Sequence, residues 1–159
     1  MPTMTAIENS LKETLGGERL KNALDLVAHM GRLGMTVEEG RFYYKGEMMS
    51  IFIYFKNDKN PEGELYICDG PLTGHEDFPV GGAVEAYVRA SVKTCTDCGC
   101  DHPERGKTKT VFGQEYENLC SSEVMFANPD ANAVEKLMKL MDLWVYKIDH
   151  VTGYSSQER

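Results

Sequence analysis

The stretch EMMSIFIYF, residues 47–55, has the composition of a long β-strand, since it is rich in β-branched and aromatic residues. The odd positions from Met49 to Phe55 form one apolar face, and the even positions are apolar too, apart from Ser50. A strand that is apolar on both faces is typical of a central strand with layers on either side. We therefore predict that residues 47–55 lie in the middle of a sheet and are buried on both faces.

Shorter strands are predicted on either side of this stretch. Residues 41–44 precede it, separated by a Lys45-Gly46 turn, and residues 64–68 follow a polar loop over 56–63 that contains Asn60-Pro61. Connections this short predict a three-stranded antiparallel meander. Two later segments, residues 108–112 and 123–127, are predicted as further strands.

Helical periodicity surrounds the strands. Residues 7–15 and 18–33 are predicted as helices, with Gly34 as a left-handed stop, and residues 82–93 as another. The last helix is predicted to begin at Asn128-Pro129-Asp130, with Asn128 as its cap and Pro129 in its first turn. Its apolar stripe, which should bury the single tryptophan, consists of Val134, Leu137, Met138, Met141 and Trp144.

These elements predict an α+β fold, in which an antiparallel sheet of about five strands in α–βββ–α–ββ–α order carries helices packed on it. Residues 1–150 are expected to form a single domain, with residues 151–159 as a frayed polar tail. The predicted order resembles that of the dimeric chaperones that escort bacterial secretion substrates. This resemblance, which lies in the predicted topology alone, implies a homodimer that binds a protein partner without metal.

Composition excludes several classes of function. The net charge of −8, with no run of lysine or arginine, argues against nucleic acid as a partner. The longest unbroken apolar run, residues 51–55, is far shorter than the ~20 residues of a membrane-spanning helix. Residues 1–15 lack the pattern of a secretory signal, so a cytoplasmic location is expected.

The clearest motif is a cluster of cysteines in the second half of the chain. Residues 95–102 read Cys-Thr-Asp-Cys-Gly-Cys-Asp-His, and Cys-x-x-Cys-Gly is the spacing of a metal knuckle, in which both thiols converge on one ion. In the reducing cytosol, cysteines are free, catalytic or metal-bound more often than disulfide-linked. The chain has five cysteines, and an odd number also argues against a closed set of disulfides. We therefore predict a Zn²⁺ site, and its candidate ligands are Cys95, Cys98, Cys100, His102 and Cys120.

The prediction has a definite geometry and open alternatives. Cys95 and Cys98 should supply two ligands, Cys120 a third, and either Cys100 or His102 the fourth. Cys120 is expected to return to the knuckle because it lies between the two late predicted strands. The zinc is expected to be structural, because no His-Glu-x-x-His motif or deaminase motif accompanies it. An iron–sulfur cluster, a redox Cys-x-x-Cys pair and unligated thiols are the alternatives.

A second candidate site is the segment from Cys68 to Asp77, which would make the chain an enzyme. His75 is followed by Glu76 and Asp77, and a histidine among carboxylates can act as a general base. A solvated loop is the alternative interpretation of this segment. His29 and His150 are expected at the surface or at the edge of the core rather than as ligands.

Overall fold

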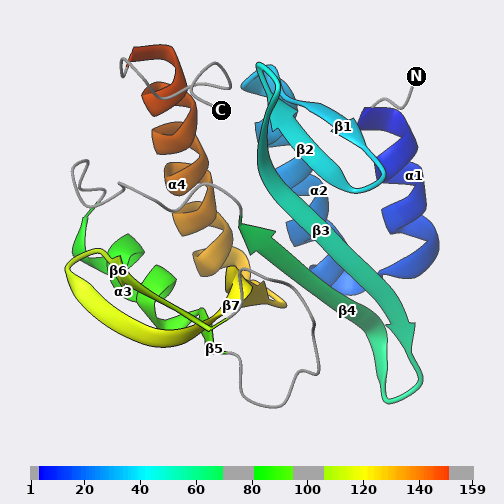
Figure 1. The fold of residues 1–159 in the computed structure, drawn as a ribbon. Helices are drawn as coiled ribbons and strands as arrows, with labels where there is room; N and C mark the ends of the chain where they lie inside the picture. The colour runs from blue at the N-terminus through cyan, green and yellow to red at the C-terminus, as the bar shows by residue number, and fades with distance from the viewer. Residues whose placement is uncertain (1–3, 70–80, 95–105, 151–159) are drawn as a thin grey trace.

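The structure, a computed structural model, describes residues 4–69, 81–94 and 106–150. Within these ranges the chain forms four helices and a seven-stranded sheet, and every strand pair is antiparallel. The predicted α+β class is confirmed (Figure 1). In chain order the elements are α1 (Met4–Thr14), α2 (Gly17–Arg32), β1 (Thr36–Glu38), β2 (Arg41–Tyr44), β3 (Glu47–Asn57), β4 (Asn60–Asp69), α3 (Gly82–Ala90), β5 (Val92–Thr94), β6 (Lys107–Val111), β7 (Gln114–Ala127) and α4 (Ala131–His150).

The predicted count of five strands and the order α–βββ–α–ββ–α are wrong. The sequence pattern did not predict β1, and the predicted helix over 82–93 ends at Ala90 and gives way to β5. Both of these strands have only three residues, too few to show a period of two. Each is a strand because a neighbour pairs with it, β2 with β1 and β7 with β5.

Two other boundaries move because strands continue into segments that were predicted as loops. β4 begins at Asn60, which pairs with Asn57, so Asn60-Pro61 lies in the strand and the turn before it is only Asp58-Lys59. β7 spans 114–127 and absorbs most of the loop that was predicted between the two late strands.

Two tight turns join the first three strands, and each contains a glycine, which adopts positive φ readily. Glu39-Gly40 joins β1 to β2, and Lys45-Gly46 joins β2 to β3, with positive φ at all four residues. Consecutive positive φ angles define the hairpin turn whose twist matches that of the flanking strands, and glycine is preferred in it. The turn predicted at Lys45-Gly46 is confirmed, and Glu39-Gly40 is a second turn of the same kind.

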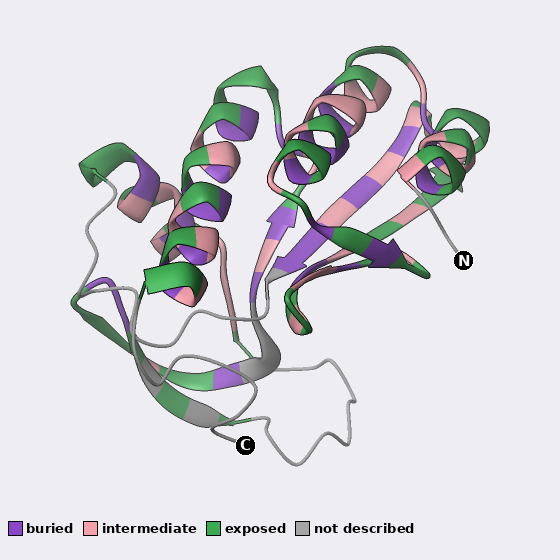
Figure 2. Cartoon of the chain, turned by 90° about the horizontal axis from the view of Figure 1, so that it is seen from above, coloured by how far each residue is buried: buried purple, intermediate pink, exposed green. Residues whose placement is uncertain are grey.

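The strand order in the sheet is β1-β2-β3-β4-β7-β5, and β6 pairs with the first half of β7. β3 is central, as predicted, since β2 and β4 lie on its two sides. Figure 2 shows the helices on one side of the sheet, with their buried residues turned toward it. No helix in the described ranges is long and apolar enough to cross a membrane.

The prediction that β3 is buried on both faces is wrong. Phe52 is buried beneath the helices, whereas Ile53 and Phe55 on the opposite face are 44% and 45% exposed. Phe55 stacks on Tyr66 of β4, with ring centroids 6.0 Å apart. All four helices pack on the Phe52 face, so no described helix covers Ile53 and Phe55. The apolar residues of β3 therefore extend onto the face of the sheet that no described helix covers.

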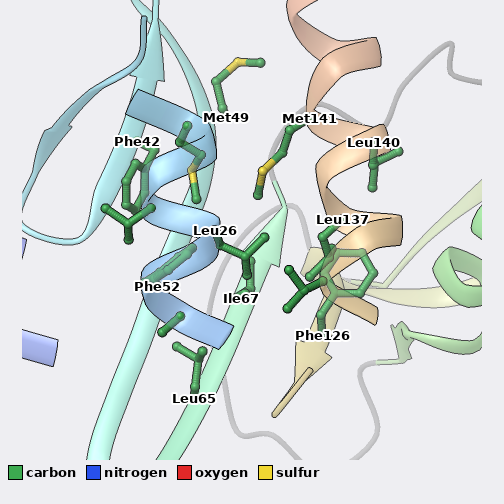
Figure 3. Packing of buried hydrophobic residues seen from close by; sticks show 14 of the residues in the cluster. Leu26, Phe42, Met49, Phe52, Leu65, Ile67, Phe126, Leu137, Leu140 and Met141 are labelled. Atoms are coloured by element: carbon green, nitrogen blue, oxygen red, sulfur yellow. The ribbon is translucent and has the colours of Figure 1, made fainter. Parts of the chain in front are cut away.

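The core lies between the sheet and helices α2 and α4 (Figure 3). The prediction for the last helix is confirmed, since Leu137, Met141 and Trp144 are all buried there. Leu26 of α2 and Phe126 of β7 are fully buried in the same cluster. One continuous core in a chain of this length is large enough to support the fold without help from a metal or a disulfide.

The start of α4 differs from the prediction in its cap. The side chain of Asp130, not Asn128, accepts a hydrogen bond from the backbone of Ala133, with Oδ1 2.8 Å from the nitrogen. Asn128 instead adopts a φ of 43° and turns its amide toward the sheet. Its Oδ1 accepts from the backbone nitrogen of Leu65 at 2.7 Å, and its Nδ2 donates to Glu64 at 2.6 Å. Asn128 therefore joins β4 to the β7–α4 connection.

Candidate functional site

Most of the predicted zinc ligands lie outside the described residues. These are Cys95, Cys98, Cys100 and His102, and of Cys120 the structure describes the strand but not the side chain. Cys120 lies within β7 rather than between two strands, because β7 already begins at Gln114. The late hairpin therefore turns at residues 112–113, well before Cys120.

The described ends of the cysteine segment meet at Leu119, the residue before Cys120. Thr94, the last residue of β5, pairs with Leu119, and Lys107 of β6 also pairs with Leu119. In addition, the backbone nitrogen of Gly106 donates to the carbonyl oxygen of Leu119 at 2.7 Å. Because one strand residue can pair with only one neighbour on each side, β5 and β6 flank β7 at this point. Thr94 and Gly106, the described residues on either side of the cysteine segment, thus lie beside the same residue.

The alternative site, from Cys68 to Asp77, is described only at its start. His75, Glu76 and Asp77 lie outside the described residues. Cys68 lies in β4 and is 4% exposed, while its carbonyl oxygen accepts a hydrogen bond from the Ser50 hydroxyl. A thiol buried this deeply inside a sheet has little access to a substrate.

His29 and His150, the two histidines in the described helices, contact neighbouring side chains. Nε2 of His29 lies 2.7 Å from a carboxylate oxygen of Asp142, which links α2 to α4. The ring of His150 packs against that of Tyr146, with centroids 4.5 Å apart. Over the described ranges, no three histidine, cysteine or acidic side chains gather in a geometry that could hold a metal ion.

A small cluster of titratable groups ties the end of α4 to the β2–β3 turn. Asp149 accepts hydrogen bonds from the Tyr44 hydroxyl at 2.9 Å and from Lys45 Nζ at 2.6 Å. The hydrogen bond from Lys45 lowers the pKa of Asp149, and the same bond raises the pKa of Lys45. These groups are exposed to solvent, so we interpret the cluster as a surface tie rather than as a catalytic centre.

Tyr87 is a titratable group with a raised pKa at the edge of a cavity. Burial, together with the nearby charge of Asp130, raises the pKa of Tyr87 to about 12. Its ring lies 5.7 Å from Lys136 Nζ and borders a cavity of about 230 Å³. A phenol with so high a pKa stays protonated at neutral pH and cannot serve as a general base there.

A cavity of about 600 Å³ lies between α1 and β3. Its walls are formed by Ala6, Ile7 and Ser10 of α1, by the Glu39-Gly40 turn and by residues 51–54 of β3. The hydroxyl of Tyr54 donates to the Ser10 hydroxyl at 2.8 Å and closes one side. No pattern used in the sequence analysis predicted this cavity. The Glu39-Gly40 turn was a signal for it, because β2 begins directly after this turn, beside the middle of β3.

Comparison with known proteins adds no assignment to this geometry. No protein-family model, characterised protein or solved structure matches the chain.

Proposed function

We propose that this chain is a zinc-binding protein in which the knuckle of Cys95 and Cys98 binds one structural Zn²⁺. Cys120 supplies the third ligand and either Cys100 or His102 the fourth. The observation that carries the proposal is the meeting of β5 and β6 at Leu119, beside Cys120.

Chain connectivity explains why this meeting supports a shared ion. Thr94 and Leu119 are cross-strand partners, and neighbouring strands lie about 5 Å apart. The next residue after each is a cysteine, and consecutive Cα atoms are about 3.8 Å apart. Because the two strands are antiparallel, the chain leaves Thr94 and Leu119 in opposite directions, so the Cα atoms of Cys95 and Cys120 can be at most about 13 Å apart. Two cysteine side chains within that distance can be brought to one ion, with Zn–S bonds of about 2.3 Å, if the chain turns after Thr94.

The role proposed for zinc is to hold together the part of the sheet built on β7. This part is formed by β5, β6 and the first half of β7, and it joins the main core through Val111 and Phe112. Metal binding is coupled to folding of the segment that supplies the ligands. Loss of zinc should therefore loosen the cysteine segment and its flanking strands without unfolding the main core.

We predict that Cys95→Ser abolishes stoichiometric zinc and lowers the melting temperature. Elemental analysis of the purified chain should find about one zinc ion per wild-type molecule, because a four-ligand structural site binds a single ion. A chelator should lower the melting temperature of the wild type to that of the variant, while far-UV circular dichroism still shows a folded protein. Iron with inorganic sulfide and visible absorption would instead identify an iron–sulfur cluster.

The matched control is Cys68→Ala, which removes the buried thiol of β4. This variant should keep its zinc, although it loses some stability from the small cavity it creates. The zinc proposal fails if the wild type is purified without metal from zinc-supplemented medium. It fails equally if Cys95→Ser leaves both metal content and melting temperature unchanged.

A further inference from the structure

β2 begins at Arg41, opposite Ile51, whereas β3 continues to Asn57. The last residues of β3 therefore have a described neighbouring strand on the β4 side only. The last bond on the β2 side joins the backbone nitrogen of Phe52 to the carbonyl oxygen of Gly40, at 2.8 Å. Backbone groups alternate sides along a strand, so those of Tyr54 point the same way as those of Phe52. On the other side Leu65, the partner of Tyr54 in β4, uses its own amide and carbonyl on Asn128. In the described sheet, no strand pairs with Tyr54 on the β2 side.

Helix α1 borders this edge and leaves room beside it. A cavity of about 600 Å³ is lined by Ala6, Ile7 and Ser10 of α1 and by residues 51–54, with the Tyr54 hydroxyl bonded to Ser10 across it. A second, of about 370 Å³, is lined by residues 13–16 and by residues 56–58. Figure 1 shows α1 alongside the part of β3 that extends past the β1–β2 hairpin. The first cavity borders the edge of β3 beyond β2, and the second lies at the tip of the β3–β4 hairpin, where Pro61 and Gly63 of β4 also line it. We call the space along residues 52–57 of β3 the groove. At about 3.3 Å per residue, it accommodates an extended segment of roughly six residues.

We propose that the groove binds an extended segment of a partner protein, which adds to β3 as an antiparallel strand in line with β2. Such a segment supplies the donor and acceptor that no residue of the described ranges supplies to the backbone of Tyr54. Ile53 and Phe55, both nearly half exposed, become cross-strand neighbours of its side chains. The segment should therefore carry apolar or β-branched side chains at alternate positions.

The charges of the groove favour a basic segment. Its lining contains the acids Glu13, Glu39 and Asp58 and the bases Arg41 and Lys56. Glu39 and Arg41 form an ion pair at 3.9 Å, which leaves two acids against one base, and the whole chain carries −8. An antiparallel strand enters at the end where Glu13 and Asp58 lie and leaves near Arg41. Lysine or arginine at the N-terminal end of the segment matches that arrangement.

A second copy of the chain is a poorer occupant of this groove. If two copies paired through their β3 edges, helix α1 of the second copy would be brought toward the space beside α1 of the first copy. A single extended segment brings no helix with it. This inference does not depend on zinc, because the groove and the cysteine segment are bordered by different strands.

The test uses the full chain and a fluorescein-labelled peptide, KRVTVTVS, in which apolar valine alternates with threonine after a basic start. Fluorescence anisotropy should detect saturable binding. Ile53→Lys and Phe55→Lys should each weaken it by about tenfold, since each puts a charge where an apolar neighbour is needed. The matched control is Met48→Lys, also on β3 and 37% exposed, but paired with Tyr43 of β2. It should change the affinity by less than about twofold.

Backbone pairing is tested separately by amide hydrogen exchange and by a modified peptide. In the free protein the Tyr54 amide should exchange faster than those of Ile53 and Phe55, which face β4. Bound peptide should slow Tyr54, and N-methylation of alternate peptide residues should abolish binding. The proposal is overturned if the peptide does not bind, or if binding survives N-methylation. It is also overturned if sedimentation shows a dimer of this chain that protects the Tyr54 amide without peptide.

Discussion

Replacing Leu137 with alanine should lower the free energy of unfolding by about 2–5 kcal/mol, the range for a large-to-small change in a packed core. Leu137 is fully buried on α4, beside Met141 and Trp144. Figure 3 shows it pointing from the helix toward Phe126 at the end of β7. The substitution leaves a cavity between two layers, and both layers must stay in place to bury the rest of the core.

Urea denaturation followed by circular dichroism measures this effect. The matched control is Lys139→Ala on the exposed face of the same helix. It should change stability by less than about 0.5 kcal/mol, because alanine is an equally good helix former there. A loss below about 1 kcal/mol for Leu137→Ala would show that α4 does not pack as described.

The second large loss of stability is expected on replacing Asn128, whose side chain hydrogen-bonds to the backbone of β4 as a neighbouring strand would. Asn128→Gly keeps the positive φ but removes the acceptor of the Leu65 amide, and Leu65 is fully buried. An unsatisfied buried donor costs about 1–3 kcal/mol. Asn128→Ala loses the same bonds and adds the strain of a left-handed backbone, about a further 1–2 kcal/mol. Alanine should therefore be clearly worse than glycine at this position.

Comparing the two variants by denaturation separates the hydrogen bond from the backbone strain. Equal stabilities for glycine and alanine would contradict the positive φ of Asn128. Losses near zero for both would contradict the bond to Leu65. Glu64 provides an independent check, because its carboxylate accepts from both Asn128 and Asn57, at 2.6 and 2.9 Å. Glu64→Ala should remove part of the same stabilisation, so its effect should not add to that of Asn128→Ala.

The candidate sites could be predicted to different extents. The spacing of Cys95 and Cys98 predicts a metal knuckle from local sequence alone, because two intervening residues suffice to bring two thiols together. The position of Cys120 could not be derived in the same way, because it depends on where β7 begins and on which strands pair with Leu119. The open edge beside Tyr54 likewise depends on where β2 stops relative to β3.

The sequence by itself determined the elements whose signals are local. Both first helices, the last helix with its buried face, β2 and the Lys45-Gly46 turn follow from periodicity and from the conformational freedom of glycine. These signals act within one or two turns of chain, so no distant contact is needed to interpret them. The α+β class followed from their order.

Only the tertiary structure decided which surfaces are covered and which strands exist. Ile53 and Phe55 have the apolar character of core residues, but they are exposed because the helices pack on the opposite face of the sheet. β1 and β5 are strands because neighbours supply their hydrogen bonds, not because three residues prefer that conformation. Asn128, which has the sequence signature of a helix cap, bonds to β4 instead because Leu65 lies next to it in the fold. Pairing and layering are non-local, so a single sequence does not show which partner each residue meets.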